Sequence, residues 1–113
     1  RKCMVMEDMF QMGVVLDLCK LVEYSKGTIS SRQLVKSPAG NITLFAFDEG
    51  QGLSEHSAPY NALLQLLDGK AEVTVDGRTF KIEAGESIFL QANVSHAIAA
   101  KGAFKMMLTM IKA

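Results

Sequence analysis

The sequence has no tryptophan, only two prolines, two cysteines and two histidines, and no net charge at neutral pH. Cys3 and Cys19 are too few for a disulfide scaffold, and we expect two reduced thiols in a cytoplasmic protein. Twelve basic and twelve acidic residues leave no positive excess for nucleic-acid phosphates. No apolar run approaches the ~20 residues of a membrane-spanning helix. These absences argue against a disulfide-stabilised module, a nucleic-acid binder and a helical membrane protein.

Hydrophobic residues make up 49% of the 113 residues, which is enough to build the core of one domain. A disordered tail would contain far fewer of them. The absence of net charge also favours self-association over electrostatic repulsion. We therefore expect one globular domain.

The N-terminal part differs from the rest in its pattern. Val15, Leu18 and Val22 follow helical spacing, and Gly27 provides a stop signal, so a short helix is predicted over residues 14–23. The first ten residues lack the long apolar core of a secretory signal. We expect residues 1–13 to form a tail that is either loose or docked on a neighbour.

After residue 30 the hydrophobic period changes to two, which is typical of strands. The predicted strands are Ser31–Lys36, Ile42–Phe47, Asn61–Leu67, Ala71–Val75, Thr79–Glu83, Ser87–Gln91, His96–Ala99 and Phe104–Ile111. Asp76-Gly77 predicts a two-residue hairpin turn, because type I′ turns require positive φ at both central positions. Many short strands separated by glycine-containing turns indicate a sandwich or barrel.

Several of these strands are apolar on both faces. In the last strand, Phe104 and Met106 alternate with Met107, and Ile111 also lies on the second face. An antiparallel sheet with one wet face would instead alternate with polar residues. We therefore expect the outer face to be covered by the N-terminal helix or by a second subunit, and we predict a homodimer.

Two segments carry a recognisable pattern of glycine and histidine. In GQGLSEHSAPYNALLQLLDG, Gly50 opens the segment, His56 follows and Gly69 closes it; in GESIFLQANVSHAIAA, Gly85 opens the segment and His96 follows. These segments resemble the two motifs of the cupin superfamily, with His56 and His96 at histidine places. The resemblance implies an all-β fold, the double-stranded β-helix or jelly-roll barrel of a small single-domain cupin. Residues 1–27 would then form a tail and short N-terminal helix, and residues 28–113 the barrel.

The sequence departs from the family pattern at the other ligand places. Ala58 occupies the second histidine place, and Ala62 occupies the glutamate place. The proline, glycine and asparagine of the second motif are replaced by Gln91, Asn93 and Ala100. Of the three histidines and one glutamate that usually bind a metal in this family, the resemblance leaves two histidines.

His56 and His96 are therefore the predicted metal ligands. Two imidazoles hold a divalent ion only with further donors, which water or substrate oxygens would supply. Without the carboxylate the site is neutral and holds hard cations poorly. We expect at most a weakly held divalent transition metal (Zn, Ni, Cu or Fe) and no other cofactor.

The predicted interior is apolar and suits a small organic ligand. Its expected lining consists of Ala58, Ala62, Leu64, Leu66, Ile98 and Ala100. In this interpretation the histidines would orient a carboxylate, a phenol or a carbonyl by hydrogen bonds. Two alternatives remain open, namely a metal-dependent oxygenase or isomerase and a structural or regulatory dimer with a vestigial pocket. No catalytic residue is assigned.

Overall fold

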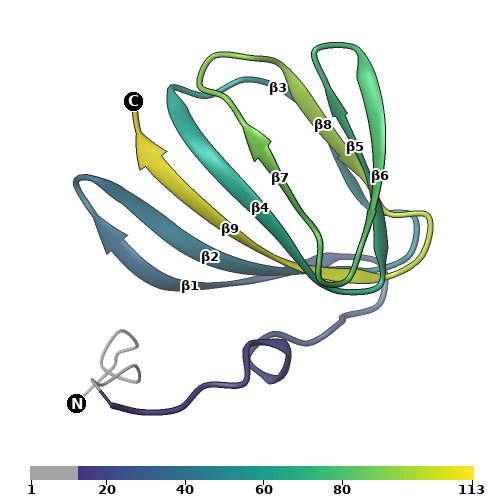
Figure 1. The fold of residues 1–113 in the computed structure, drawn as a ribbon. Coiled ribbons are helices and arrows are strands. Elements are labelled where there is room, and N and C mark those ends of the chain that lie inside the picture. The colour runs from purple at the N-terminus through teal and green to yellow at the C-terminus, as the bar shows by residue number, and fades with distance from the viewer. Residues whose placement is uncertain (1–12) are drawn as a thin grey trace.

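A computed structural model describes residues 13–113 as two antiparallel sheets that face each other (Figure 1). The five-stranded sheet has the order β1-β2-β9-β4-β7, and the four-stranded sheet has the order β3-β8-β5-β6. The bounds are β1 Ile29–Ser37, β2 Gly40–Phe47, β3 Gly52–His56, β4 Tyr60–Asp68, β5 Lys70–Val75, β6 Arg78–Glu83, β7 Ser87–Leu90, β8 His96–Ala99 and β9 Phe104–Lys112. The two sheets form the jelly-roll barrel that the motif resemblance implies.

Each of the eight predicted strands is present, with small shifts at its ends. The hairpin at Asp76-Gly77 is also confirmed, because the φ angles are 49° and 81° at the two turn residues. Strand β3 was not predicted. Leu53 is its only large apolar residue and Ser54 and Glu55 follow it, so the segment shows no alternation long enough to detect.

The prediction of a helix over residues 14–23 is wrong, since that segment contains only a single 3-10 turn, η2 (Leu18–Lys20). Contacts with the barrel replace the helical hydrogen bonds. The carbonyl of Cys19 accepts a hydrogen bond from the Lys105 ammonium, and that of Leu21 accepts one from the Arg32 guanidinium. A short helix is marginal unless tertiary packing favours it, and here packing favours an extended segment.

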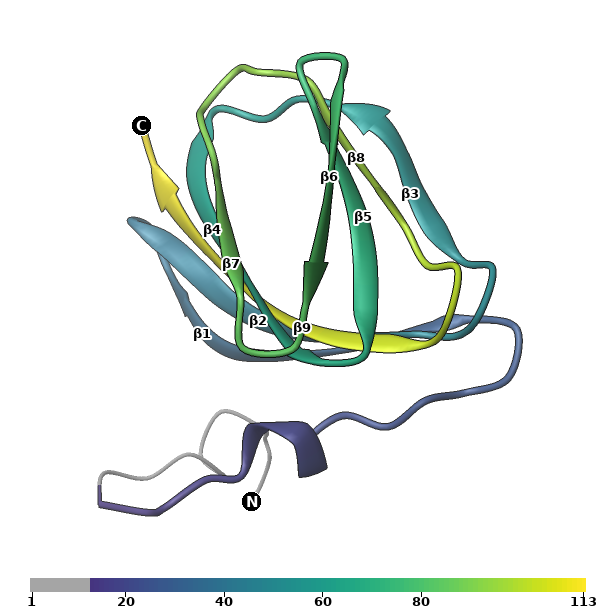
Figure 2. The same cartoon turned by 45° about the vertical axis from the view of Figure 1, so that its right-hand side comes forward.

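This N-terminal segment covers part of the outer face of the five-stranded sheet, beneath β2 and β9 (Figure 2). A second apolar cluster forms there from Val22, Leu44 and Ala46, with Leu18, Leu21, Leu34, Leu67 and Met107 packed around it. Cys19 has a free thiol in this region, and Cys3 lies outside the described residues. This cover explains in part why several strands are apolar on both faces. The homodimer stays a prediction.

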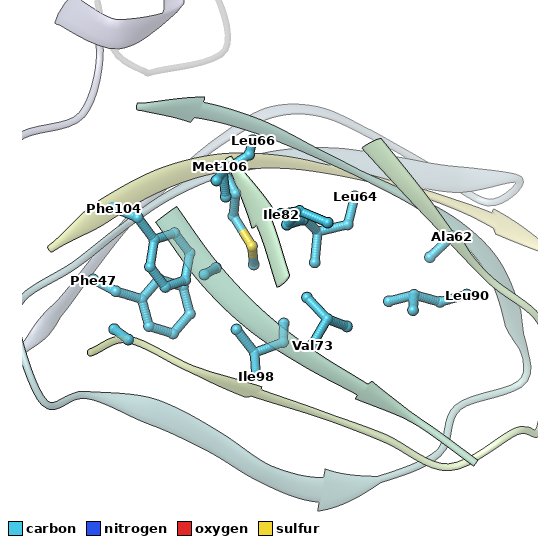
Figure 3. Close-up of a cluster of buried hydrophobic side chains, with 12 residues drawn as sticks. Phe47, Ala62, Leu64, Leu66, Val73, Ile82, Leu90, Ile98, Phe104 and Met106 are labelled. Atoms are coloured by element: carbon cyan, nitrogen blue, oxygen red, sulfur yellow. The ribbon is translucent and has the colours of Figure 1, made fainter. Parts of the chain in front are cut away.

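The main core lies between the sheets and is entirely apolar (Figure 3). At one end the rings of Phe47 and Phe104 stack with centroids 4.5 Å apart and planes inclined by 13°. Both side chains are fully buried, as are Leu64, Val73 and Met106. Among residues 13–113, no helix is long and apolar enough to cross a membrane.

Glycine is required where β4 turns into β5. Gly69 has a φ of +80°, and a Cβ there would lie 2.4 Å from the Ala103 carbonyl oxygen. We expect Gly69→Ala to destabilise the barrel by about 3 kcal/mol or more, because left-handed strain and overpacking each cost about 1–3 kcal/mol. Urea unfolding monitored by circular dichroism measures this loss.

Gly77→Ala is the matched control for that substitution. Gly77 has nearly the same φ, +81°, but nothing lies within 4 Å of its added Cβ. We expect only the conformational part of the loss, about 1–2 kcal/mol. Equal losses in the two variants would contradict the packing argument at Gly69.

Candidate functional site

The two histidines of the chain lie side by side at one end of the barrel. His56 on β3 and His96 on β8 are direct partners in the antiparallel pairing. Their ring centroids are 4.4 Å apart, and the rings meet edge to face at 64°. His96 points toward the interior because Ile98, two residues further along β8, is buried in the core.

A β-bulge in β3 turns His56 toward the same side. Leu53 pairs with Ile98 and packs on the core, and strict alternation would place a residue three positions later on the opposite face. The register shifts between Leu53 and His56, so that His56 pairs with His96 instead. Bulges commonly re-aim side chains beside functional sites. The histidine pair therefore depends on one extra residue in β3.

Hydrogen bonds fix the tautomer of both rings. Nδ1 of His56 lies 2.8 Å from the Ser54 carbonyl oxygen, and Nδ1 of His96 lies 3.2 Å from that of Val94. A carbonyl oxygen only accepts, so Nδ1 carries the proton in each ring. The unprotonated nitrogen of each neutral imidazole is consequently Nε2, which is the atom available to a metal ion or to a hydrogen-bond donor.

Burial lowers the pKa of His96 below 6.5, because it disfavours the charged imidazolium. The hydrogen bond to the Val94 carbonyl opposes this effect, and the neighbouring His56 lowers the pKa of His96 further. His96 is therefore mostly neutral at pH 7. Its Nε2 can accept a proton or coordinate a metal without first losing a proton.

Hydrogen bonds join the segment that leads from β3 into β4 in the first motif to the segment between β7 and β8 in the second. The N–H of Asn93 donates to the carbonyl of Ala58, and the N–H of Ala92 donates to the side-chain oxygen of Asn61. Ala58 and Ala62 provide no side-chain ligand. Within residues 13–113, no group of three or more His, Cys, Asp or Glu residues is arranged to hold a metal. The donor set therefore fits a metal ion only if water or a bound ligand completes it.

Most of the predicted lining lies in the packed core. Ala62, Leu64, Leu66, Ile98 and Ala100 are all buried, with exposed fractions between 0% and 6%. Ala58 is half-buried in the loop between β3 and β4. This part of the interior is filled by its own side chains, and open space lies next to it.

A cavity of about 450 Å³ opens between β6 and β7. These strands are the edges of the two sheets, and they diverge beyond the turn that joins them (Figure 2). Val75, Phe80, Ile82 and Ile88 form the apolar wall, and Lys81, Glu86, Ser87 and Phe89 complete the lining. Neither histidine lines this cavity, but Val75, which does, pairs with His96 on the neighbouring strand β8. Phe80 shows where this cavity lies. It pairs with the buried Val73, but its own side chain is 38% exposed.

A second cavity, of about 550 Å³, lies over the β5–β6 hairpin and the β8–β9 loop. The charged residues that line this cavity lie opposite residues of the other sign. Lys70 lies opposite Glu83, Glu72 lies opposite Lys81, and Lys101 forms an ion pair of 3.2 Å with Glu72. It contains neither a histidine nor a residue that pairs with one. We therefore place the candidate site at the histidine pair.

Comparison with known proteins agrees with this architecture. Residues 43–112 match the family described as "Cupin domain". A conserved protein of unknown function from Streptococcus pyogenes is 36% identical, with 92% of this chain and 91% of that chain covered and a TM-score of 0.87. A cupin superfamily protein from Desulfitobacterium hafniense is 29% identical over 91% and 94% of the two chains, with a TM-score of 0.85.

A Cupin 2 conserved barrel domain protein from Leptotrichia buccalis is 40% identical, with a TM-score of 0.83. The match covers 86% of this chain but only 47% of the Leptotrichia protein. No curated protein of assigned function matches. The family match, together with the two facing sheets and the histidines on β3 and β8, shows that this chain belongs to the cupin family.

Proposed function

We propose that this cupin binds a small organic ligand at the open end of its barrel, where His56 and His96 orient it. The observation that carries the proposal is the paired arrangement of the two imidazoles beside an apolar cavity of about 450 Å³. Small-molecule sites are typically apolar concavities with a few well-placed polar groups. This end of the barrel has that composition, whereas the opposite end is closed by stacked phenylalanines.

The two Nε2 atoms define what the site recognises. An imidazole in its neutral form accepts a hydrogen bond at Nε2, so the pair favours a hydroxyl, a phenol or a protonated acid on the ligand. The Nδ1 hydrogen bonds to Ser54 and Val94 hold the rings in place before the ligand arrives. Because the rings are pre-oriented, little conformational entropy is lost on binding.

A weakly held divalent transition metal at the same two Nε2 atoms is the second candidate. Imidazole is a good ligand for Zn, Ni, Cu and Fe, and the edge-to-face pair brings two donors together. Such an ion would act as a Lewis acid toward the ligand that completes its coordination. A metal-dependent oxygenase or isomerase would need this arrangement, whereas a structural dimer with a vestigial pocket would need neither metal nor ligand.

Zinc titration of the purified protein tests the histidine pair. We expect one equivalent of Zn²⁺ to bind and to perturb the Nε2 resonances of both rings in ¹⁵N spectra. The His56→Ala/His96→Ala variant should bind about tenfold more weakly or worse. It should still fold, because the barrel is held together by apolar burial. Circular dichroism checks the fold of the variant.

Glu55→Ala is the matched control for the zinc titration, because Glu55 precedes His56 on the same strand and is exposed. Its zinc affinity should equal that of the wild type. Zinc binding that survives loss of both histidines would show that the metal binds elsewhere, and the metal proposal would be wrong.

The lowered pKa of His96 predicts a pH effect with a definite sign. The imidazole of His96 binds a proton less tightly in the folded protein than in the unfolded chain. Folding therefore releases protons near pH 6. The resulting stability is fully present above pH 6.5 and is lost as the pH falls through the folded pKa. Urea unfolding between pH 7.5 and 5 should show this loss, and His96→Gln should remove part of it. A pKa of His96 at or above 6.5 by NMR titration would contradict the assignment.

A further inference from the structure

The histidine pair belongs to a longer row across the four-stranded sheet. His56 pairs with His96, His96 pairs with Val75, and Val75 pairs with Arg78. Residues directly opposite each other in antiparallel strands point to the same face. Val73, two residues before Val75, is fully buried in the core, so the whole row faces the interior side of the sheet.

Arg78 therefore stands at the other end of the row from His56. Phe80, two residues along β6, lies on the same face, and the Arg78 guanidinium lies 5.5 Å from the centre of its ring. This cation–π contact holds the guanidinium over the apolar wall of the cavity. Arg78 is exposed, and among residues 13–113 no ion pair with a carboxylate involves it.

We propose that the ligand of this site is an amphipathic monocarboxylate whose carboxylate is bound by Arg78. This inference rests on the proposed function and names the class of its ligand. Arginine binds a carboxylate through two parallel hydrogen bonds, which fix the ligand's orientation as well as its charge. The apolar body of the ligand packs on Val75, Phe80 and Ile88. Its far end presents a hydroxyl to the Nε2 atoms of the histidines.

The spacing of the row sets the size of the ligand. Arg78 and His96 lie on strands separated by β5, so their backbones are about 10 Å apart at the usual strand spacing. The long arginine side chain shortens the gap between the polar groups. A single ring with a para substituent, or an aliphatic chain of similar length, spans the remaining distance between the guanidinium and the imidazoles.

The charge on the row favours a carboxylate over a phosphate dianion. Arg78 is the only cationic side chain on the row, whereas Lys81, which contributes to the cavity lining, alternates with Phe80 and Ile82 on β6. Lys70 and Lys101 are placed opposite glutamates on the outer side of the sheet. A dianion usually requires a second cation or a helix N-terminus, and the row contains neither.

The test uses 4-hydroxyphenylacetate, 3-(4-hydroxyphenyl)propionate and 6-hydroxyhexanoate, each paired with its neutral amide. Isothermal titration calorimetry and histidine ¹⁵N shifts measure binding to the wild type, Arg78→Gln, Arg78→Lys and Lys70→Gln. We expect at least one acid to bind more tightly than its amide. Arg78→Gln should weaken the acid roughly tenfold or more and leave the amide unchanged, because the charged hydrogen bonds are lost. Arg78→Lys should restore only part of the affinity.

Lys70→Gln is the matched control, since it removes a positive charge from the neighbouring strand β5 on the outer face, away from the lining of this cavity. It should leave the affinity for the acid unchanged. If acid and amide bind equally and both depend on the histidines, the carboxylate inference is wrong but the proposed function stands. If none of the acids binds, the carboxylate inference is wrong. The zinc titration then tests the histidine site independently.

Discussion

The stacking of Phe47 on Phe104 is the contact on which the rest of this barrel depends. The two rings fill one end of the space between the sheets, and no polar group is buried with them. Aromatic pairs in this offset arrangement stabilise a core beyond the area they bury. This end of the core is filled, and the cavity of about 450 Å³ between β6 and β7 lies next to the other part of the core. The candidate histidine site therefore lies away from the end of the core that the stacked phenylalanine rings fill.

At the open end of the barrel, the strand register and local hydrogen bonds position the two histidine side chains. The bulge in β3 turns His56 onto the row of His96, and hydrogen bonds to Ser54 and Val94 carbonyls fix both tautomers. Alanine at positions 58 and 62 supplies no charge to the site. A pair of imidazoles near an apolar wall is suited to orienting an organic molecule, and it holds a metal only when water or a bound ligand completes the coordination.

Much of the fold could be predicted from the sequence, because alternation and turn residues report directly on strands. Strand β3 was missed since its polar residues and its bulge break the alternation. The helix was predicted wrongly because Leu18 and Val22 pack on the barrel, whereas Val15, which completes the helical spacing, is 96% exposed. The closeness of His56 and His96 follows from the motif resemblance. Arg78 had no local signal, because its place beside the histidines arises from the pairing of β5 with both β6 and β8.

The central claim is that the imidazoles of His56 and His96 face each other with Nε2 free for a ligand. Long-range ¹H–¹⁵N correlation spectra of the ligand-free protein above pH 7.5 measure this most directly, combined with nuclear Overhauser effects between the rings. The account predicts that both rings are protonated at Nδ1 and that their carbon-bound protons are in contact. Rings protonated at Nε2, or rings without mutual contacts, would contradict it.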